Sequence, residues 1–309
     1  MKLISIVTPC YNEEENVEEV YRQVKDVFRK LKKYRYEHLF IDNASTDSTV
    51  EKLRALARAD RNVKVILNAR NFGPVRSPNY GLLQSTGDAA VLLVADLQDP
   101  PVLIPEMLGK WEQGYKIVVA VKKESGEGRL MFAVRKLYYS LVTRLSETEL
   151  IKNFTGFGLY DKQVLEILRT INDPYPYFRG LICDIGFERA TLEYVQPARH
   201  RGFTKINFYT LYDVAMLGIT NHSKVPLRLA AMLGFLFAVL SLLVAIAYLV
   251  YKLVFWSEFS LGIAPLVIGF FFFSSLQLFF IGIIGEYIGS IHTQVMRRPM
   301  VVEKERINC

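Results

Sequence analysis

Two uncharged apolar runs in the last third of the chain constrain its architecture more than any other feature. They cover Leu229–Tyr251 and Phe259–Gly285, and neither contains a charged side chain. A helix needs about 20 apolar residues to cross a bilayer core of roughly 30 Å, so each run is long enough to span a membrane. The sequence therefore predicts a two-helix transmembrane hairpin over residues 226–290.

Basic residues flank this hairpin on both sides. The chain has a formal net charge of +7, and many of its positive side chains lie near the apolar runs: Arg199, Arg201, Lys205, Lys224, Arg228, Arg297, Arg298, Lys304 and Arg306. Cytoplasmic loops are enriched in Lys and Arg, so we expect both ends of the hairpin to face the cytoplasm. The prediction is a multi-pass protein of the cell (inner) membrane, with a juxtamembrane segment over 201–225 and a basic cytoplasmic tail over 291–309.

Two further segments mix apolar, aromatic and basic residues. For Leu130–Leu145 two interpretations stay open, a helix packed on the soluble domain or a helix lying at the membrane surface. Phe208–Ile219, just before the hairpin, is predicted to be interfacial. The positive charges are dispersed along the chain and form no single tract, so we expect no nucleic-acid partner.

The first 120 residues alternate between short β-rich runs and helical periodicity. We expect strands at Leu3–Thr8, His38–Ile41, Val63–Leu67, Ala89–Ala95 and Lys116–Val121. We expect helices at Glu13–Leu31, from Ser45 or Thr46 to Ala59, at Tyr80–Ser85 and at Val102–Gln113, with a turn-rich stretch over Asn68–Asn79. Such alternation predicts an α/β domain with a Rossmann-like, mostly parallel sheet.

Polar residues follow three of these strands at the point where each strand ends. Asn12 comes after the first strand, Asp42 after the second and Asp96 after the fourth. Ligands of open α/β sheets bind beyond the carboxyl ends of the strands. Each group alone is a weak signal because turns are rich in Asn and Asp, but three groups at one edge predict a functional site there.

The motifs around these positions resemble glycosyltransferase family 2, in particular its polyisoprenyl-phosphate glycosyltransferase branch, which includes dolichol-phosphate mannose synthase and the bactoprenol glucosyltransferases. The resemblance covers nearly the whole chain. Its segments are PCYNEEEN at 9–16, IDNASTD at 41–47, RNFG at 70–73, ADLQDPP at 95–101, NFTGFGLYD at 153–161, residues 199–205 and the hairpin. It implies a GT-A fold for residues 1–200.

By this resemblance the first loops hold a nucleotide-sugar donor, with UDP as the expected nucleotide. Matched by motif position, the residues implied in donor binding are Pro9, Tyr11, Asn12, Glu13, Asp42 and Arg70. Physically, an acidic side chain at a strand end can accept hydrogen bonds from ribose hydroxyls or from the base. A turn-capping role for Asp42 is the alternative.

The resemblance also implies a divalent cation, Mg²⁺ or Mn²⁺, held by Asp96 with help from the Gln98 carbonyl. A cation would stabilise the negative charge that develops on the leaving diphosphate. The family's usual Asp-x-Asp has Val94 at its first position here, so one carboxylate is missing. Asp99 precedes Pro100 and is expected to cap the next helix.

A second departure from the family pattern lies near the expected acceptor. Gly156 stands where many family members have an aspartate. A hydroxyl acceptor needs a general base, whereas a phosphate monoester, with a second pKa of about 6, is already largely ionised at neutral pH. The departure therefore favours a phosphate acceptor. Arg201 and Lys205 match the family's basic loop and join Asp96 as predicted catalytic residues, although they also fit a purely topological role.

These expectations define one leading function and two rivals. The leading prediction is inverting transfer of a single sugar, from UDP-glucose or a similar donor, to undecaprenyl or another polyisoprenyl phosphate at the cytoplasmic membrane face, for modification of cell-surface glycans. A polysaccharide synthase is less favoured, because the Gln-x-x-Arg-Trp segment of those enzymes is absent from the sequence. A non-catalytic nucleotide-sugar-binding scaffold is the second rival. The resemblance leaves a homo-oligomer open.

Overall fold

The computed structural model describes residues 1–123, 151–197, 208–255 and 263–309. Its elements in chain order are β1 (Lys2–Cys10), α1 (Val17–Lys30), β2 (Tyr34–Asp42), α2 (Thr49–Ala59), β3 (Val63–Asn68), α3 (Gly73–Leu83), β4 (Ala89–Leu92), the 3₁₀ turn η1 (Pro101–Leu103), α4 (Ile104–Glu112), β5 (Ile117–Lys122), β6 (Phe154–Asp161), α6 (Lys162–Ile171), α7 (Phe178–Asp184), β7 (Arg189–Tyr194), α8 (Phe208–His222), α9 (Val225–Val254), α10 (Ile263–Val295) and β8 (Glu303–Ile307). The amphipathic segment predicted at Leu130–Leu145 lies outside these residues.

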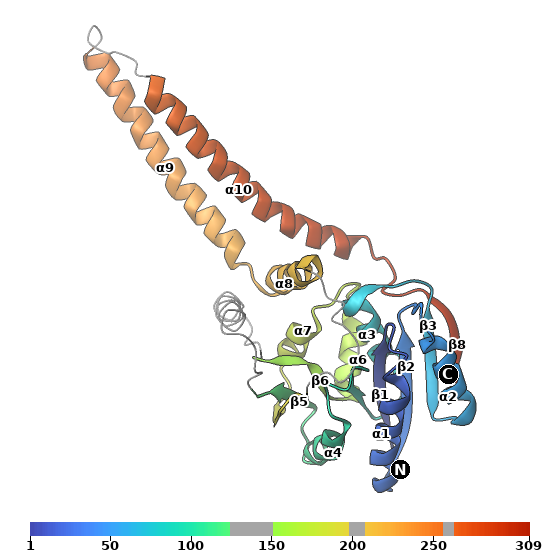
Figure 1. Cartoon of the computed structure of the whole chain (residues 1–309). Coiled ribbons are helices and arrows are strands. Elements are labelled where there is room, and N and C mark those ends of the chain that lie inside the picture. Colours follow the sequence, from blue (N-terminus) through green and yellow to red (C-terminus); the bar gives the residue numbers. More distant parts are fainter. Residues whose placement is uncertain (124–150, 198–207, 256–262) are drawn as a thin grey trace.

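One eight-stranded sheet organises the soluble domain, with the strand order β7-β5-β6-β4-β1-β2-β3-β8 (Figure 1). The pairs β4–β1, β1–β2, β2–β3 and β5–β7 are parallel, whereas β6 and β8 run antiparallel to their neighbours. The predicted α/β class with a mostly parallel sheet is confirmed. The central strands are buried on both faces, which explains their continuous apolar sequences.

Strand β6 was not expected as a strand, and it lies between β4 and β5. Gly158 permits this close pairing, because a Cβ atom there would lie 2.5 Å from the carbonyl oxygen of Val118 on β5. The two strands therefore approach each other in a way that a larger residue would prevent. Because β6 lies antiparallel between β4 and β5, it separates β5 from the parallel strands β4, β1, β2 and β3. The alternation in the sequence had predicted β5 as a further strand of that parallel group.

Two buried apolar clusters hold helices on opposite faces of the sheet. One combines side chains of α1 and α4 with the sheet, including Val20, Val24 and Trp111. The other combines side chains of α3 and α6, including Leu82 and Leu165. Burying apolar area is the main favourable term in folding, so these clusters fix the sheet whose edge carries the polar loops.

Helix α3 begins earlier than expected. The turn-rich sequence after Asn68 predicted an irregular stretch up to Asn79, but the helix starts at Gly73. Pro74 stands in its first turn, where a missing N–H costs no hydrogen bond. The prediction was wrong here because Pro and Gly were interpreted as loop residues, when they mark the start of a helix.

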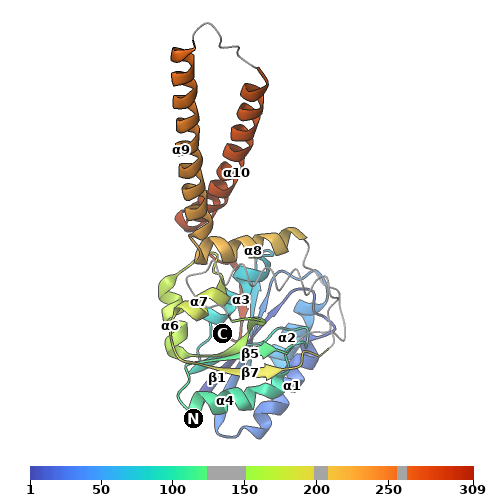
Figure 2. The ribbon, with the colours of Figure 1, turned by 90° about the vertical axis from the view of Figure 1, so that its left-hand side faces the viewer.

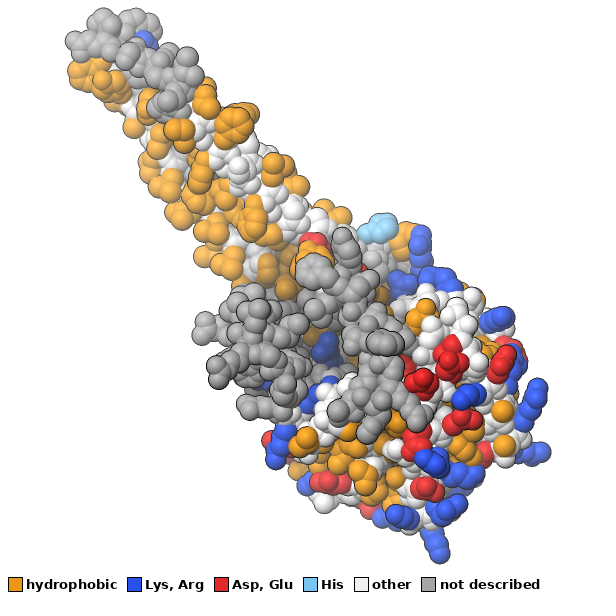
Figure 3. All heavy atoms as spheres, viewed as in Figure 1, with side chains coloured by type: hydrophobic (Ala, Val, Ile, Leu, Met, Phe, Trp, Pro, Cys, Tyr) orange, Lys and Arg blue, Asp and Glu red, His pale blue; other side chains and the backbone are white. Residues whose placement is uncertain are grey.

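Helices α9 and α10 form the predicted hairpin and extend away from the soluble domain (Figures 1 and 2). Both are long and apolar enough to cross a membrane, and almost none of their apolar windows is buried against the rest of the protein. Figure 3 shows hydrophobic side chains covering the hairpin, whereas charged side chains gather on the soluble domain. Their exposed apolar surface is what a lipid environment would cover.

Helix α8 lies across the base of the hairpin, between it and the soluble domain (Figure 2). Its Tyr212 hydroxyl donates to Glu286 of α10 at 2.9 Å, and its Asn221 side chain accepts a hydrogen bond from Ser290 at 3.0 Å. The segment Phe208–Ile219, which was predicted to be interfacial, forms most of helix α8. This helix connects α10 to the soluble domain.

The last residues correct the expected tail over 291–309. Helix α10 continues to Val295, and β8 then pairs antiparallel with β3 at the edge of the sheet. Glu303 accepts a hydrogen bond from the Tyr80 hydroxyl at 2.7 Å, and Glu305 forms an ion pair with Arg54. As an edge strand, β8 (Glu303–Ile307) is only partly buried and can keep charged side chains. Its sequence therefore resembles a charged, solvated tail.

Candidate functional site

Three loops meet at the carboxyl edge of the central strands. In the parallel register Cys10 of β1 lies beside Asp42 of β2, and Val7 of β1 lies beside Leu92 of β4. The loops that follow these strands therefore start at the same edge. This brings together the polar groups that the sequence placed after separate strands.

Each of the three loops contains one non-glycine residue in the left-handed region. They are Asn12 with φ 54°, Ala44 with φ 61° and Leu97 with φ 59°. Asparagine adopts this region readily, but alanine and leucine do so at a cost in free energy. Such conformations persist where surrounding contacts impose them, and they cluster at functional sites.

The first two loops are joined by hydrogen bonds that use both backbone and side chains. The N–H of Asn12 donates to Ser45 Oγ at 2.8 Å, and Asn12 Oδ1 accepts from the N–H of Thr46 at 2.7 Å. The N–H of Glu13 donates to Thr49 Oγ1, also at 2.8 Å. Asn12 and Glu13 were predicted to contact the donor, and their backbone groups fix the loop pair that would surround it.

Asp42 lies at the end of β2 and is 1 % exposed. Its carboxylate accepts hydrogen bonds from the backbone N–H and the hydroxyl of Ser45, so the turn-capping role is present. Burial raises the pKa of Asp42, and the bonds from Ser45 and Ala44 only partly oppose that rise. The carboxylate is therefore desolvated at the base of the loop that follows β2.

Asn43 connects this region to the loop after β3, and the sequence analysis did not select it. Its Oδ1 accepts from the Phe72 N–H at 2.8 Å and from Asn68 Nδ2 at 3.1 Å, while its Nδ2 donates to Asn71 Oδ1 at 2.8 Å. The side chain is buried and engages donors and acceptors on one neighbouring loop. The only sequence signal for Asn43 is its position directly after Asp42. That signal is weak, because asparagine is common in turns after strands.

The remaining predicted donor residues lie on these same loops. Pro9 and Tyr11 are half-buried at the end of β1, and Glu13 Oε2 accepts from Asn16 Nδ2 at 2.7 Å. Arg70 is exposed, its guanidinium lies 4.0 Å from the centroid of the Phe72 ring, and its side chain donates to the Asn71 carbonyl. Arg70 therefore stands on the loop that Asn43 holds.

Asp96 follows β4 and is half-buried, with its Oδ1 accepting the N–H of Gln98 at 3.1 Å. Within the described parts of the chain, no group of three His, Cys, Asp or Glu side chains is placed to hold a metal ion. Mg²⁺ is typically bound by one or two carboxylates plus substrate phosphate oxygens, not by an all-protein cage. The Asp96 carboxylate and the Gln98 carbonyl fit such an open set, in which the substrate supplies further oxygens.

Asp99 does not cap the helix that follows it, contrary to expectation. The residue before η1 is Pro100, and no side-chain cap is formed there. The Asp99 carboxylate is 4 % exposed and accepts the Tyr194 hydroxyl at 2.7 Å. Burial raises the pKa of Asp99 to about 6, against the opposing effects of Tyr194 and Lys122. Sequence reasoning missed this contact because Tyr194 is 95 positions away.

Gly156 on β6 has φ 109°, a conformation that favours glycine. An aspartate at this position would be strained, so the backbone itself is adapted to glycine. The Gly156 carbonyl accepts the Tyr160 hydroxyl at 2.6 Å. Arg201 and Lys205 lie outside the described residues.

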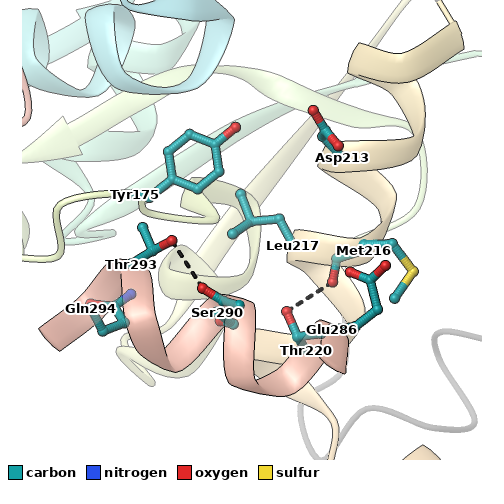
Figure 4. Close-up of a pocket in the computed structure, with 10 residues that line it drawn as sticks. Tyr175, Asp213, Met216, Leu217, Thr220, Glu286, Ser290, Thr293 and Gln294 are labelled. Carbon is teal, nitrogen blue, oxygen red and sulfur yellow. Dashed lines mark hydrogen bonds between the residues drawn. The ribbon is translucent and has the colours of Figure 1, made fainter. Parts of the chain in front are cut away.

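A pocket of about 240 Å³ lies between α8, α10 and the segment containing Tyr175 (Figure 4). It contains none of the predicted donor residues, and Asp213 and Glu286 line it. Two carboxylates make it ill-suited to a phosphate group. Nearby, Leu217 of α8 lies in one apolar cluster with Tyr177, and Val75 from the first turns of α3 packs against the same cluster. Because α3 starts at the carboxyl edge of the sheet, this shared cluster links α8 to that edge.

Comparisons with known proteins identify the family of this chain. The model of the family "Glycosyl transferase family 2" matches residues 5–169. This chain belongs to glycosyltransferase family 2. One relative, the uncharacterized glycosyltransferase YkcC of Bacillus subtilis, is 35% identical over 299 residues, which cover 96% of this chain and 92% of YkcC. The bactoprenol glucosyl transferase of Shigella phage SfX is 33% identical over 304 residues, covering 98% of this chain and 99% of that protein.

Among solved structures, the mannosyltransferase PcManGT from Pyrobaculum calidifontis, in complex with GDP-Man and Mn²⁺, aligns with a TM-score of 0.47 at 18% identity. The alignment covers 95% of this chain and 86% of that one. The family match over residues 5–169 contains the three loops at the carboxyl edge and strand β6. The chain is thus a glycosyltransferase whose family-defining segment includes the candidate site.

Proposed function

We propose that this glycosyltransferase moves one sugar from a UDP-sugar to a polyisoprenyl phosphate at the cytoplasmic face of the membrane, with inversion at the anomeric carbon. The relatives named bactoprenol glucosyl transferases support this acceptor class and a glucose-type donor. The observation that carries the proposal is the apolar cluster that α8 shares with the first turn of α3, at the loop edge of the sheet. Helix α8 is also hydrogen-bonded to α10, so this edge is connected to the base of the apolar hairpin.

The chain's own residues would bind and orient the donor. The loop pair containing Tyr11, Asn12 and Asp42 would hold the nucleotide, since its buried carboxylate and rigid backbone present acceptors and donors in fixed positions. Arg70, on the loop that Asn43 fixes, would approach the donor from the other side. Two partners held in this way react as if at high effective concentration.

Asp96 and Gln98 would hold Mg²⁺ or Mn²⁺ together with donor diphosphate oxygens. Such a cation supplies stabilisation of the negative charge on the departing nucleoside diphosphate. The Asp96 side chain would be oriented for this role by its contact with the Gln98 N–H. One protein carboxylate at this position suffices when substrate oxygens complete the set.

The acceptor requires no general base from the protein. An oxygen of the lipid phosphate attacks the anomeric carbon, the bond from that carbon to the diphosphate oxygen breaks, and UDP leaves. A phosphate monoester is largely dianionic at neutral pH, so no proton has to be removed. A glycine at position 156, with its backbone adapted to that residue, is consistent with this chemistry. Arg201 and Lys205 are proposed to bind the acceptor phosphate.

The experiment compares two acceptors that differ only in the phosphate. Purified full-length protein in lipid nanodiscs is supplied with a panel of radiolabelled UDP- and GDP-sugars and with either undecaprenyl phosphate or undecaprenol. We expect one labelled lipid product, formed from a UDP-sugar and undecaprenyl phosphate only. Transfer to undecaprenol would contradict the phosphate acceptor, a polymeric product would favour a polysaccharide synthase, and donor binding without any transfer would favour a scaffold.

A further inference from the structure

The loop that carries Asp96 ends at a second acidic residue, which is held from a neighbouring strand. The buried Asp99 carboxylate accepts the hydroxyl of Tyr194, the last residue of β7, at 2.7 Å. Gln98 is next to Asp99 in the chain, and Asp96 lies three positions before it. The position of both proposed cation-binding side chains therefore depends on how firmly Asp99 is held.

This arrangement is unfavourable unless Asp99 keeps the hydrogen bond from Tyr194. A carboxylate that is 4 % exposed has lost nearly all of its water, and such groups are tolerated when hydrogen bonds replace it. The loop also contains Leu97 in the left-handed region, which leucine adopts at a cost. Surrounding contacts must therefore impose the loop conformation, and the Asp99 contacts are positioned to do so.

Tyr194 is a rigid partner for this purpose. It is the last residue of β7, it pairs with Lys122 of β5, and its carbonyl accepts the N–H of Lys123 at 2.8 Å. Its ring is 5 % exposed and packs edge-on against Phe157 of β6, with ring centroids 5.7 Å apart. The hydroxyl thus extends from a fixed ring in the sheet to the Asp99 carboxylate.

We propose that Tyr194 is a positioning residue of the donor site: through Asp99 its hydroxyl fixes the loop that presents Asp96 and Gln98. Tyr194 touches neither substrate nor cation in this proposal. Its role rests on the proposed function, because it concerns how the same site binds a UDP-linked donor and a divalent cation. Loosening the loop should weaken binding of both before it affects the chemical step.

The test compares two tyrosine-to-phenylalanine variants in the full-length chain in nanodiscs. Tyr194→Phe removes the hydroxyl and keeps the ring that packs on Phe157. Tyr34→Phe is the matched control, because Tyr34 is 6 % exposed and its hydroxyl also donates to a carboxylate, Glu112, at the amino end of β2. Binding of Mn²⁺ in the presence of UDP is followed by the electron paramagnetic resonance signal of free Mn²⁺. Donor KM, kcat and thermal unfolding are measured on the same samples.

For Tyr194→Phe we expect Mn²⁺ binding weakened about tenfold and donor KM raised by a similar factor, as for loss of a hydrogen bond to a charged group. We expect kcat to change less than KM. Tyr34→Phe should lower the unfolding temperature and leave Mn²⁺ binding and KM unchanged. Equal Mn²⁺ binding by Tyr194→Phe and the unaltered chain would overturn the proposal.

Asp99→Asn gives an independent route if Tyr194→Phe folds poorly. If both residues act through one hydrogen bond, the double variant should bind Mn²⁺ no more weakly than the weaker-binding single variant. Fully additive losses would contradict the shared bond and overturn the proposal. If the unaltered chain bound no Mn²⁺ with UDP while Mg²⁺ and Mn²⁺ both failed to support transfer, the proposed function would fall, and the positioning role with it.

Discussion

The two ends of the sheet both contain buried carboxylates, but their surroundings have opposite effects. At the amino end, Glu37 is 4 % exposed, and burial alone would raise its pKa. Hydrogen bonds from Lys64, Ser5 and Thr86 outweigh burial, so the pKa of Glu37 is lowered. At the carboxyl end, burial dominates for Asp42 and Asp99, and their pKa values are raised.

This difference separates a structural carboxylate from carboxylates at a candidate site. Glu37 is neutralised by a lysine and by the Thr86 backbone and hydroxyl, so its charge is fully used inside the protein. At the carboxyl end the acidic side chains are desolvated and held mainly by neutral donors. Sites whose charges are compensated by a ligand show such perturbation. The comparison predicts that substitutions at the two ends will fail in different ways.

The largest expected effect is on catalysis at the carboxyl end. Asp96→Ala should reduce sugar transfer by about 10²–10³-fold or more, the usual cost of losing a group that stabilises developing charge. Asp88→Ala is the control at the amino end of β4, where the carboxylate accepts the Leu3 N–H. It should leave transfer per folded molecule unchanged. Initial rates with a saturating donor measure both, and full activity of Asp96→Ala would remove its assignment.

At the amino end the same type of change should affect folding instead. Glu37→Gln leaves the Lys64 ammonium, which is 25 % exposed, without its carboxylate partner, and losing a hydrogen bond to a charged group typically costs about 1.5–3 kcal/mol. We expect a loss of this size in the free energy of unfolding and unchanged kcat for the folded protein. Denaturant unfolding and rates at low temperature test this. A large fall in kcat with intact stability would erase the distinction between the two ends.

The pH dependence of stability offers a smaller test at the same end. His38 is fully buried, and burial lowers its pKa to about 3 from an ordinary 6.5. Below pH 6.5 the unfolded chain takes up a proton that the folded chain does not, so stability falls as pH falls towards 3. The contribution is about 2 kcal/mol between pH 7.5 and pH 5.

His38→Gln isolates this contribution. Asp99 has a raised pKa and acts in the opposite direction over the same range, so the quantity to measure is the difference between His38→Gln and the unaltered chain. Working above pH 5 avoids Glu37, whose lowered pKa affects stability only in more acidic solution. Parallel stability curves for the two proteins would show that His38 titrates alike in the folded and unfolded states.

The sequence predicted those parts of the fold that depend on local patterns. Strands β1 to β4 each coincide with a short apolar run. The polar residues after three of them converge because parallel strands end at one edge of the sheet. The hairpin could also be predicted, since length and apolar composition decide it. The family match covers residues 5–169, a range that contains these loops.

Features that depend on distant partners could not be predicted in this way. Strand β8 pairs with β3 across more than 230 positions, and its alternating charges resemble a solvated tail. Asn43 and Asp99 carry ordinary turn signals, and only their neighbours in space show what they hold. The position of the helix start at Gly73 was missed for a local reason, because Pro fits both a turn and a first helical turn.

The smallest expected effect tests whether the comparison extends to a second structural carboxylate. The hydrogen bond from Arg306 lowers the pKa of Glu303 on β8. Burial opposes this shift, and the hydrogen bond from Tyr80 adds to it. Like Glu37, Glu303 is paired with a positive side chain, so we expect it to serve folding only. Tyr80→Phe removes the hydroxyl that donates to Glu303 at 2.7 Å and leaves Arg306 in place. We expect a loss of about 1 kcal/mol in the free energy of unfolding, typical of one such bond, with unchanged kcat and donor KM. Denaturant unfolding and steady-state rates check this, and a change in KM without a change in stability would show that the β8 edge communicates with the donor loops.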